Sequence, residues 1–253
     1  MSEVKDVKYI EYGDANKDAI ILLHGGGFSW WNYREIAETL SSDYHIILPI
    51  LDGHAKSNDD LSTIEDNAAR IISFIDEHLG GSVLLIGGLS LGGQILLEIL
   101  SQRKNICRYA LVESALVIPS KFTYSMIKPA FGSCYGLIKH KWFAKLQFRS
   151  YRIKQELFED YFRDTCGISK QNMISFLQAN SLYSVKESLK ESCSKVSIFV
   201  GEKENNAMQK SASIIHNALP GSSLQVLPKM YHGEFSMNHA NDYANTVRQM
   251  IQN

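Results

Sequence analysis

Short apolar runs recur along the chain, and each is followed by turn residues and then by a segment with helical periodicity. Near-continuous apolar runs are typical of strands in a parallel sheet that helices cover on both faces. The pattern therefore predicts buried or half-buried strands, which lie at residues 4–12, 19–23, 44–50, 83–86, 109–112, 196–200 and 224–227.

The segments between these runs carry apolar side chains three and four positions apart, as one face of a helix does. The clearest case is residues 64–79, where Ser62 and Glu65 form a plausible capping box at the helix start. Further helices are predicted at residues 91–101, 207–219 and 240–251. Strands that alternate with helices predict an α/β fold with a doubly wound, mostly parallel sheet.

One region interrupts this alternation. Residues 119–195 contain no convincing buried strand, are rich in aromatic and basic side chains, and have helical patterns such as Leu157, Tyr161 and Phe162. The strands on either side fit a single sheet. We therefore interpret residues 119–195 as a helical cap, or lid, inserted into a core made of residues 1–118 and 196–253, rather than as a separate small domain.

The composition is that of an ordinary globular protein, with 253 residues, 45% hydrophobic and 21% charged. The formal net charge of -1 gives no overall electrostatic reason to bind nucleic acid or an acidic membrane surface. Basic side chains in the cap either favour an anionic group on a substrate or keep the cap soluble; they are Lys128, Lys139, Lys141, Lys145, Arg149 and Arg152.

The four cysteines are far apart and form no Cys-x-x-Cys pair, so neither a zinc site nor a redox motif is predicted. Isolated thiols fit a reducing compartment. The start of the chain is polar and lacks the apolar segment of a signal peptide, and no apolar stretch is long enough for a bilayer span. These features predict a cytoplasmic protein without a membrane span.

Residues 88–92 read Gly-Leu-Ser-Leu-Gly and stand between a predicted strand and a predicted helix. This is the setting of a nucleophile elbow, where a serine on a sharp turn projects its hydroxyl from the sheet. Side chains two positions before and after the serine would collide with neighbouring backbone, so both positions favour glycine. The helix that begins at Leu91 directs its positive end towards this point. Ser90 is therefore the candidate nucleophile.

A second glycine-rich segment, His-Gly-Gly-Gly-Phe at residues 24–28, follows the strand at residues 19–23. Glycines allow backbone N–H groups to approach a developing negative charge closely. We expect the N–H groups of Leu91 and Gly26 to form an oxyanion hole. A phosphate-binding loop is disfavoured because no Gly-Lys-Ser/Thr or Gly-x-Gly-x-x-Gly pattern is present. His24 is expected to brace the loop rather than to act as a base.

The general base should lie in a loop that follows a strand, because Ser90 is at the carboxyl edge of the sheet. His232 meets this condition, since it follows the strand at residues 224–227. His239 is the alternative, but its position at the start of the last predicted helix favours a capping or surface role.

The carboxylate that orients the base should also follow a strand. Glu204 and Glu202 follow the strand at residues 196–200, and Glu113 follows the strand at residues 109–112. We favour Glu204 and keep Glu113 as the main alternative acid. The choice stays open because a catalytic triad is defined by its geometry, whereas the sequence identifies only the loop that carries the acid.

Taken together, these motifs resemble the α/β-hydrolase superfamily over essentially the whole chain. Residues 24–27 resemble its oxyanion loop, and residues 51–57 resemble its Asp-x-x-Gly-His-Gly-x-Ser turn, with Ala55 in place of a glycine. The order Ser90, acid, His232 is the family order. Residues 201–204 are similar to its Gly-x-x-Asp segment, with Glu in place of Asp. The resemblance implies a cap inserted after the sixth strand.

These residues predict a carboxylesterase-like serine hydrolase that cleaves an ester or related acyl bond of a small, mostly apolar substrate through an acyl-enzyme. No cofactor, metal or nucleic-acid partner is predicted. One alternative is a lyase or carbon–carbon hydrolase that uses the same triad. Another is a slow-turnover ligand-binding or signalling protein with this fold.

Overall fold

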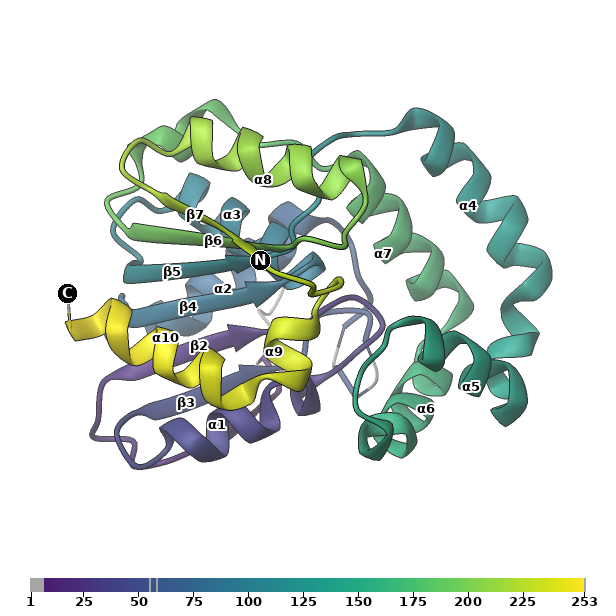
Figure 1. The fold of residues 1–253 in the computed structure, drawn as a ribbon, viewed down its shortest axis with the longest axis horizontal. Helices are drawn as coiled ribbons and strands as arrows, with labels where there is room; N and C mark the ends of the chain where they lie inside the picture. Colours follow the sequence, from purple (N-terminus) through teal and green to yellow (C-terminus); the bar gives the residue numbers. More distant parts are fainter. Residues whose placement is uncertain (1–6, 55, 58, 253) are drawn as a thin grey trace.

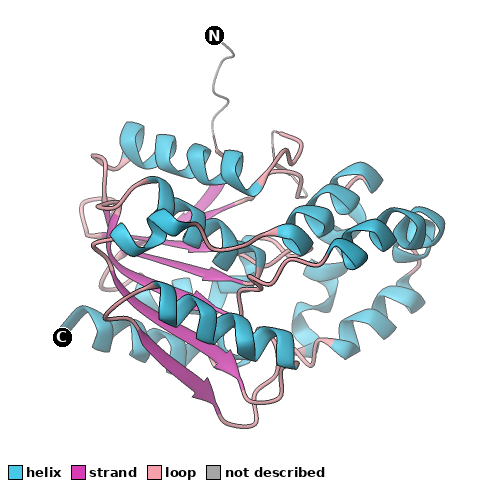
Figure 2. Ribbon diagram, turned by 90° about the horizontal axis from the view of Figure 1, so that it is seen from above, coloured by secondary structure: helices cyan, strands magenta, loops and turns pink. Residues whose placement is uncertain are grey.

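A seven-stranded sheet forms the centre of the protein (Figures 1 and 2). The computed structural model describes residues 7–54, 56–57 and 59–252. The strand order is β1-β3-β2-β4-β5-β6-β7, and β1 pairs antiparallel with β3 while every other pair is parallel. The predicted doubly wound, mostly parallel sheet is therefore confirmed.

Each predicted strand is present, although residues 4–6 of the first lie outside the described residues. The strand after residue 83 is longer than predicted, because it continues through Gly87 and Gly88, which pair with neighbouring strands on both sides although they are not apolar. The strands are β1 (Tyr9–Tyr12), β2 (Ala19–Leu23), β3 (His45–Pro49), β4 (Val83–Leu89), β5 (Cys107–Glu113), β6 (Lys195–Gly201) and β7 (Ser223–Leu227).

The helices of the core connect these strands. One detail differs from the sequence prediction, which placed a capping box at Ser62 and Glu65. Helix α2 (Ile64–His78) is capped by the side chain of Thr63, which accepts the N–H of Asp66 at 2.9 Å. The core helices are α1 (Arg34–Leu40), α2 (Ile64–His78), α3 (Leu91–Gln102), α8 (Asn206–Ala218), α9 (Glu234–Asn238) and α10 (Ala240–Gln252), and the 3-10 helix η1 (Trp30–Tyr33) precedes α1.

The two faces of the sheet carry separate hydrophobic cores, because successive strand residues point to opposite faces. Ile20 and Leu22 of β2 pack with apolar residues of α1 and α10. Ile21 and Leu23 pack on the other face with apolar residues of α2, α3 and α8. Helices therefore cover the sheet on both sides, as the continuous apolar runs predict.

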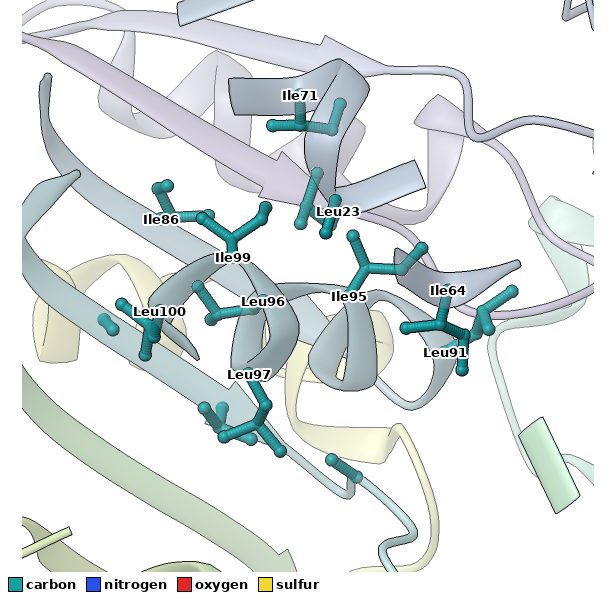
Figure 3. Close-up of a cluster of buried hydrophobic side chains, with 14 of the residues drawn as sticks. Leu23, Ile64, Ile71, Ile86, Leu91, Ile95, Leu96, Leu97, Ile99 and Leu100 are labelled. Carbon is teal, nitrogen blue, oxygen red and sulfur yellow. The ribbon is translucent and has the colours of Figure 1, made fainter. Parts of the chain in front are cut away.

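Helix α3 is buried along most of its length, and Figure 3 shows its apolar side chains beside those of β2, β4 and α2. Its residues from Leu91 to Leu100 are all buried, because the helix lies between the sheet, α2 and the 3-10 helix η4 (Glu187–Glu191). A helix enclosed in this way has little freedom to shift. Its first turn is therefore a fixed point on which the chain can build a site.

Residues 119–194 are all described, and none of them is in a strand. Helix α4 lies at the edge of the molecule farthest from the sheet, with α7 between them (Figure 1). The segment contacts the core through the hydrogen bonds Trp31 Nε1 to Asp164 (3.0 Å) and Leu61 N to Asn172 (3.1 Å). Its elements are α4 (Lys121–Cys134), η2 (Tyr135–Lys139), α5 (Lys141–Ser150), η3 (Gln155–Leu157), α6 (Phe158–Gly167), α7 (Lys170–Leu182) and η4 (Glu187–Glu191).

No helix within the described ranges combines the length and apolar character that a membrane span requires.

Candidate active site

Ser90 stands on a strained turn between β4 and α3. Its φ of 54° and ψ of -111° lie outside the usual range of a residue with a side chain. A Cβ on Gly88 would lie 2.4 Å from the Gly92 carbonyl oxygen, and a Cβ on Gly92 would lie 2.0 Å from the Leu23 carbonyl oxygen. Both distances are far below van der Waals contact, so glycine is required on each side of Ser90 for the steric reason expected.

The glycine loop after β2 leaves one of its amides free. The N–H groups of Gly25, Gly27 and Phe28 donate to Asn32 Oδ1 (3.1 Å), His54 Nε2 (3.0 Å) and the Gly25 carbonyl (3.1 Å). Among the described residues, the Gly26 N–H has no acceptor.

The N–H of Leu91, the first residue of α3, also has no acceptor in the described part of the chain. A Cβ built on Gly26 would lie 3.5 Å from the Leu91 Cβ, so the two residues are neighbours. The structure thus places two free amides close to Ser90, at the two residues expected from sequence.

Two buried histidines hold this loop in place. His24 Nε2 accepts the N–H of Leu51 at 3.1 Å while its Nδ1 donates to the Gly25 carbonyl at 2.9 Å. His54 Nε2 accepts the N–H of Gly27, and its Nδ1 donates to the Asp52 carbonyl at 3.1 Å. Burial lowers the pKa of His24 to about 3 and that of His54 to about 4. Both rings are therefore neutral near pH 7 and act as fixed acceptors.

His232 and Glu204 form a short hydrogen-bonded pair. His232 Nδ1 donates to Glu204 Oε2 at 2.7 Å. The Glu204 side chain is 1% exposed, whereas that of His232 is 42% exposed. Because Nδ1 is engaged with the carboxylate, Nε2 is the imidazole nitrogen that remains available for a proton transfer.

Glu204 is held by further donors. Its Oε1 accepts the Ser114 hydroxyl and the Gly201 N–H, both at 2.7 Å. Burial by itself would raise the pKa of Glu204, but the hydrogen bonds from His232, Ser114 and Gly201 together bring its pKa below the ordinary value. The carboxylate is thus ionised and fixed in position beside His232.

Ser114 was not among the residues singled out from sequence. It follows β5 directly and has a φ of 54°, and its N–H donates to the Phe199 carbonyl of β6 at 2.9 Å. The available signal was its place at the end of β5, since the ends of neighbouring parallel strands lie side by side.

Glu113, the alternative acid, occupies a different environment. It is fully buried, and its Oε1 accepts the Ser236 N–H at 3.3 Å while Oε2 has no partner among the described residues. Burial raises the pKa of Glu113 to about 7. Its backbone carbonyl accepts the N–H of Ser90 at 2.9 Å. In the described structure His232 donates its hydrogen bond to Glu204, whereas Glu113 accepts the N–H groups of Ser90 and Ser236.

The two remaining candidates lie apart from this arrangement. Glu202 is exposed, and its Oε2 accepts the N–H of Lys229 at 2.7 Å. His239 follows α9, and its Nδ1 lies 3.6 Å from a carboxylate oxygen of Asp242.

A small cavity connects the candidate residues. It has a volume of about 70 Å³, and Ser90, His232 and Gly26 all line it. The rest of its wall is mainly apolar and comes from both the core and the inserted segment, through Phe28, Leu89, Tyr151, Ile153 and Met237. Ligand pockets usually measure about 300–1,000 Å³, so this space holds only a small chemical group.

The sequence of the chain matches a known protein family. A model described as the alpha/beta hydrolase family matches residues 20–244. The chain belongs to the alpha/beta hydrolase family. No curated protein matches it.

Solved structures share the fold across nearly the whole chain at low sequence identity. An esterase from Thermogutta terrifontis is 14% identical with a TM-score of 0.79, and the match covers 97% of this chain and 93% of that one. An enol-lactonase from Burkholderia xenovorans LB400 is 14% identical with a TM-score of 0.80, covering 98% and 96%. A bromoperoxidase from Bacillus anthracis is 15% identical with a TM-score of 0.81, covering 97% and 95%. These matches show the alpha/beta hydrolase fold.

Proposed function

We propose that this alpha/beta hydrolase cleaves an ester or related acyl bond of a small, mostly apolar substrate, with Ser90, His232 and Glu204 as its catalytic triad. The observation that carries the proposal is the 2.7 Å hydrogen bond between His232 and Glu204, beside a serine on a strained elbow in the same cavity.

The acylation step follows from the positions of these groups. The Ser90 hydroxyl oxygen attacks the substrate carbonyl carbon as His232 Nε2 accepts the hydroxyl proton. Glu204 stabilises the imidazolium that forms, because the carboxylate is already hydrogen-bonded to Nδ1. His232 then returns the proton to the leaving alcohol, and the acyl group remains on Ser90. Water, activated by His232, releases the acid and restores Ser90.

The negative charge that develops on the carbonyl oxygen needs donors that are already in place. The free amides of Gly26 and Leu91 supply them. His24 and His54 contribute indirectly, since their hydrogen bonds fix the loop that contains Gly26. Each step uses groups of the chain itself, so the proposal includes no metal or cofactor.

Residues 119–195 act in this proposal as the cap that selects substrates. Tyr151 and Ile153 from this segment close one side of the cavity, and the Phe176 ring would lie 3.1 Å from a Cβ on Gly26. A cavity of about 70 Å³ with an apolar wall favours a short acyl group.

A panel of p-nitrophenyl esters tests the proposal. We expect hydrolysis of the acetate and propionate, weak hydrolysis of the octanoate, and no effect of EDTA. Ser90→Ala should fold normally and lower kcat by several powers of ten. Retention of most of the activity by Ser90→Ala would show that another residue is the nucleophile. Loss of activity in EDTA, with recovery when a divalent ion is added, would indicate metal-assisted hydrolysis and contradict the proposed triad mechanism.

A further inference from the structure

The charge of the chain is unevenly distributed. Between Glu113 and Glu156 the sequence contains six Lys, two Arg and no Asp or Glu, although the net charge of the whole chain is -1. This stretch forms α4, η2 and α5. The net charge of the chain is therefore close to zero because one strongly cationic region is balanced by an acidic excess in the other residues.

Most of these cations have no acidic partner. Lys141 pairs with Glu159 and Lys154 pairs with Glu35. Among the described residues, no carboxylate lies within ion-pair distance of the other six. All six are exposed: Lys121, Lys128, Lys139, Lys145, Arg149 and Arg152.

Large apolar side chains are exposed on the same two helices. On α5, Trp142 and Leu146 are 63% and 62% exposed, and Lys145 and Arg149 follow them at the three- and four-residue spacing of one helix face. On α4, Phe122 is 77% exposed and Met126, one turn later, is 48% exposed.

A groove joins the two helices. Its volume is about 510 Å³, and its lining is largely apolar, with Ala130, Phe131 and Cys134 from α4 and Phe143 and Leu146 from α5. The exposed apolar side chains of α4 therefore continue into a groove that α5 completes. Of the fourteen residues of α4, only Ile127 is buried. The surface lies at the end of the molecule farthest from the sheet (Figure 1).

We propose that this surface, formed by the outer sides of α4 and α5 and the groove between them, binds the surface of an anionic lipid bilayer. Exposed aromatic and aliphatic side chains enter the boundary between headgroups and acyl chains, while flanking Lys and Arg side chains reach the anionic headgroups. The net charge of the chain gives no reason to bind an anionic membrane. The local charge of this surface determines the interaction, however, because salt screening limits the range of electrostatic attraction to about 10 Å at moderate salt.

Two features favour lipid over a protein partner. Protein interfaces are enriched in Arg and depleted in Lys, whereas four of the five cations on α4 and α5 are Lys. A second copy of this chain would bring the same positive charge against the surface and would be repelled. Lipid headgroups supply the opposite charge, and the acyl region accepts Phe122 and Trp142.

Vesicle sedimentation tests the proposal without reference to any catalytic activity. The wild-type chain should co-sediment with vesicles of phosphatidylcholine and phosphatidylserine, bind phosphatidylcholine vesicles much more weakly, and dissociate as salt rises. Tryptophan fluorescence should shift to shorter wavelength on binding, and this shift should disappear in Trp142→Phe, because Trp142 is the tryptophan on this surface.

Matched variants locate the surface. Lys128→Gln, Lys145→Gln and Arg149→Gln combined should weaken binding by about a hundredfold, at about fivefold per cation. Lys8→Gln, Lys104→Gln and Lys210→Gln combined remove the same charge from exposed sites elsewhere and should bind like wild type. Phe122→Ser with Trp142→Ser should weaken binding by about tenfold or more, whereas Ile214→Ser with Val226→Ser should not.

Thermal unfolding midpoints confirm that each variant is folded. Equal binding to neutral and anionic vesicles, absence of binding, or an equal loss in the control variants would each overturn the proposal. A wild-type dimer that the combined Phe122→Ser and Trp142→Ser variant dissociates in sedimentation equilibrium would overturn it as well, because it would assign the surface to contacts between copies of the chain.

Discussion

The carboxyl edge of the sheet and the outer helices α4 and α5 differ in how strongly their residues are constrained. At the sheet edge, Ser90 is flanked by glycines that no other residue could replace without a clash, and the Glu204 carboxylate accepts three hydrogen bonds. On α4, only Ile127 is buried, and the neighbouring positions face solvent. One region is specified by steric and hydrogen-bonding requirements, and the other mainly by charge and apolar character.

This difference predicts how each region responds to change. Removal of a polar group at the sheet edge leaves its partner unsatisfied in a buried place, which is costly. A substitution on the outer side of α4 leaves the neighbouring groups in water, so its effect on folding is small. Catalysis and stability should therefore be sensitive at the sheet edge, while the outer helices should tolerate change except in the interactions that they make with other molecules.

The largest expected effect concerns the two buried carboxylates. Glu204→Gln should lower kcat by about a thousandfold or more, because an amide cannot stabilise the imidazolium and can select the wrong tautomer of His232. Glu113→Gln should retain most of the wild-type kcat, since Glu113 makes no hydrogen bond to His232 in the described structure. Steady-state kinetics with p-nitrophenyl acetate measure both. A crippled Glu113→Gln beside a fully active Glu204→Gln would transfer the acid role to Glu113.

The next effect is on stability as a function of pH. Burial raises the pKa of Glu113 from 4.5 to about 7. The folded chain therefore binds this proton more tightly than the unfolded chain. The resulting stabilisation is complete below pH 4.5 and is lost as pH rises through about 7, a change of about 3 kcal/mol.

Urea unfolding of wild type and Glu113→Gln at pH 5 and pH 8 isolates the contribution of Glu113 to the free energy of unfolding, because the other titrating groups are common to both chains. The free energy of unfolding of wild type should fall relative to that of Glu113→Gln between these two pH values. Parallel changes in the two proteins would mean that Glu113 does not hold a proton in the folded state.

The smallest of these effects is on substrate choice. Tyr151 packs against Phe28, with ring centroids 5.5 Å apart, and closes the cavity from the side of the inserted segment. Tyr151→Ala should lengthen the cavity and raise kcat/KM for butyrate and hexanoate esters relative to acetate by about tenfold. Tyr124→Ala, at an exposed position of α4, is the matched control and should keep the wild-type preference. An unchanged preference in Tyr151→Ala would remove the inserted segment from substrate selection.

The parts of this structure that sequence predicted are those governed by local rules. Gly88 and Gly92 identify the turn at Ser90 because their steric role depends on adjacent backbone, and apolar runs identify the strands because each is buried on both faces. The loops of His232 and Glu204 were found because parallel strands end at one edge of the sheet.

The parts that sequence did not predict depend on contacts between distant segments. Ser114 bonds to Glu204 across two strand ends, and His54 accepts the Gly27 amide from another loop. Whether Glu204 or Glu113 meets His232 also depends on side-chain placement that no local pattern encodes. The cap of α2 at Thr63 differs from the predicted Ser62 by one residue, which is the usual uncertainty of a helix boundary.

The central claim is that Ser90 is a nucleophile activated by His232 and Glu204, and covalent labelling tests it most directly. A fluorophosphonate probe should modify the native chain once, and peptide mass spectrometry should place the adduct on Ser90. Labelling should be slow in Glu204→Gln and fast in Glu113→Gln, because His232 is hydrogen-bonded to Glu204. An adduct on a different serine, or ester hydrolysis by a chain whose Ser90 stays unmodified under these conditions, would contradict the account.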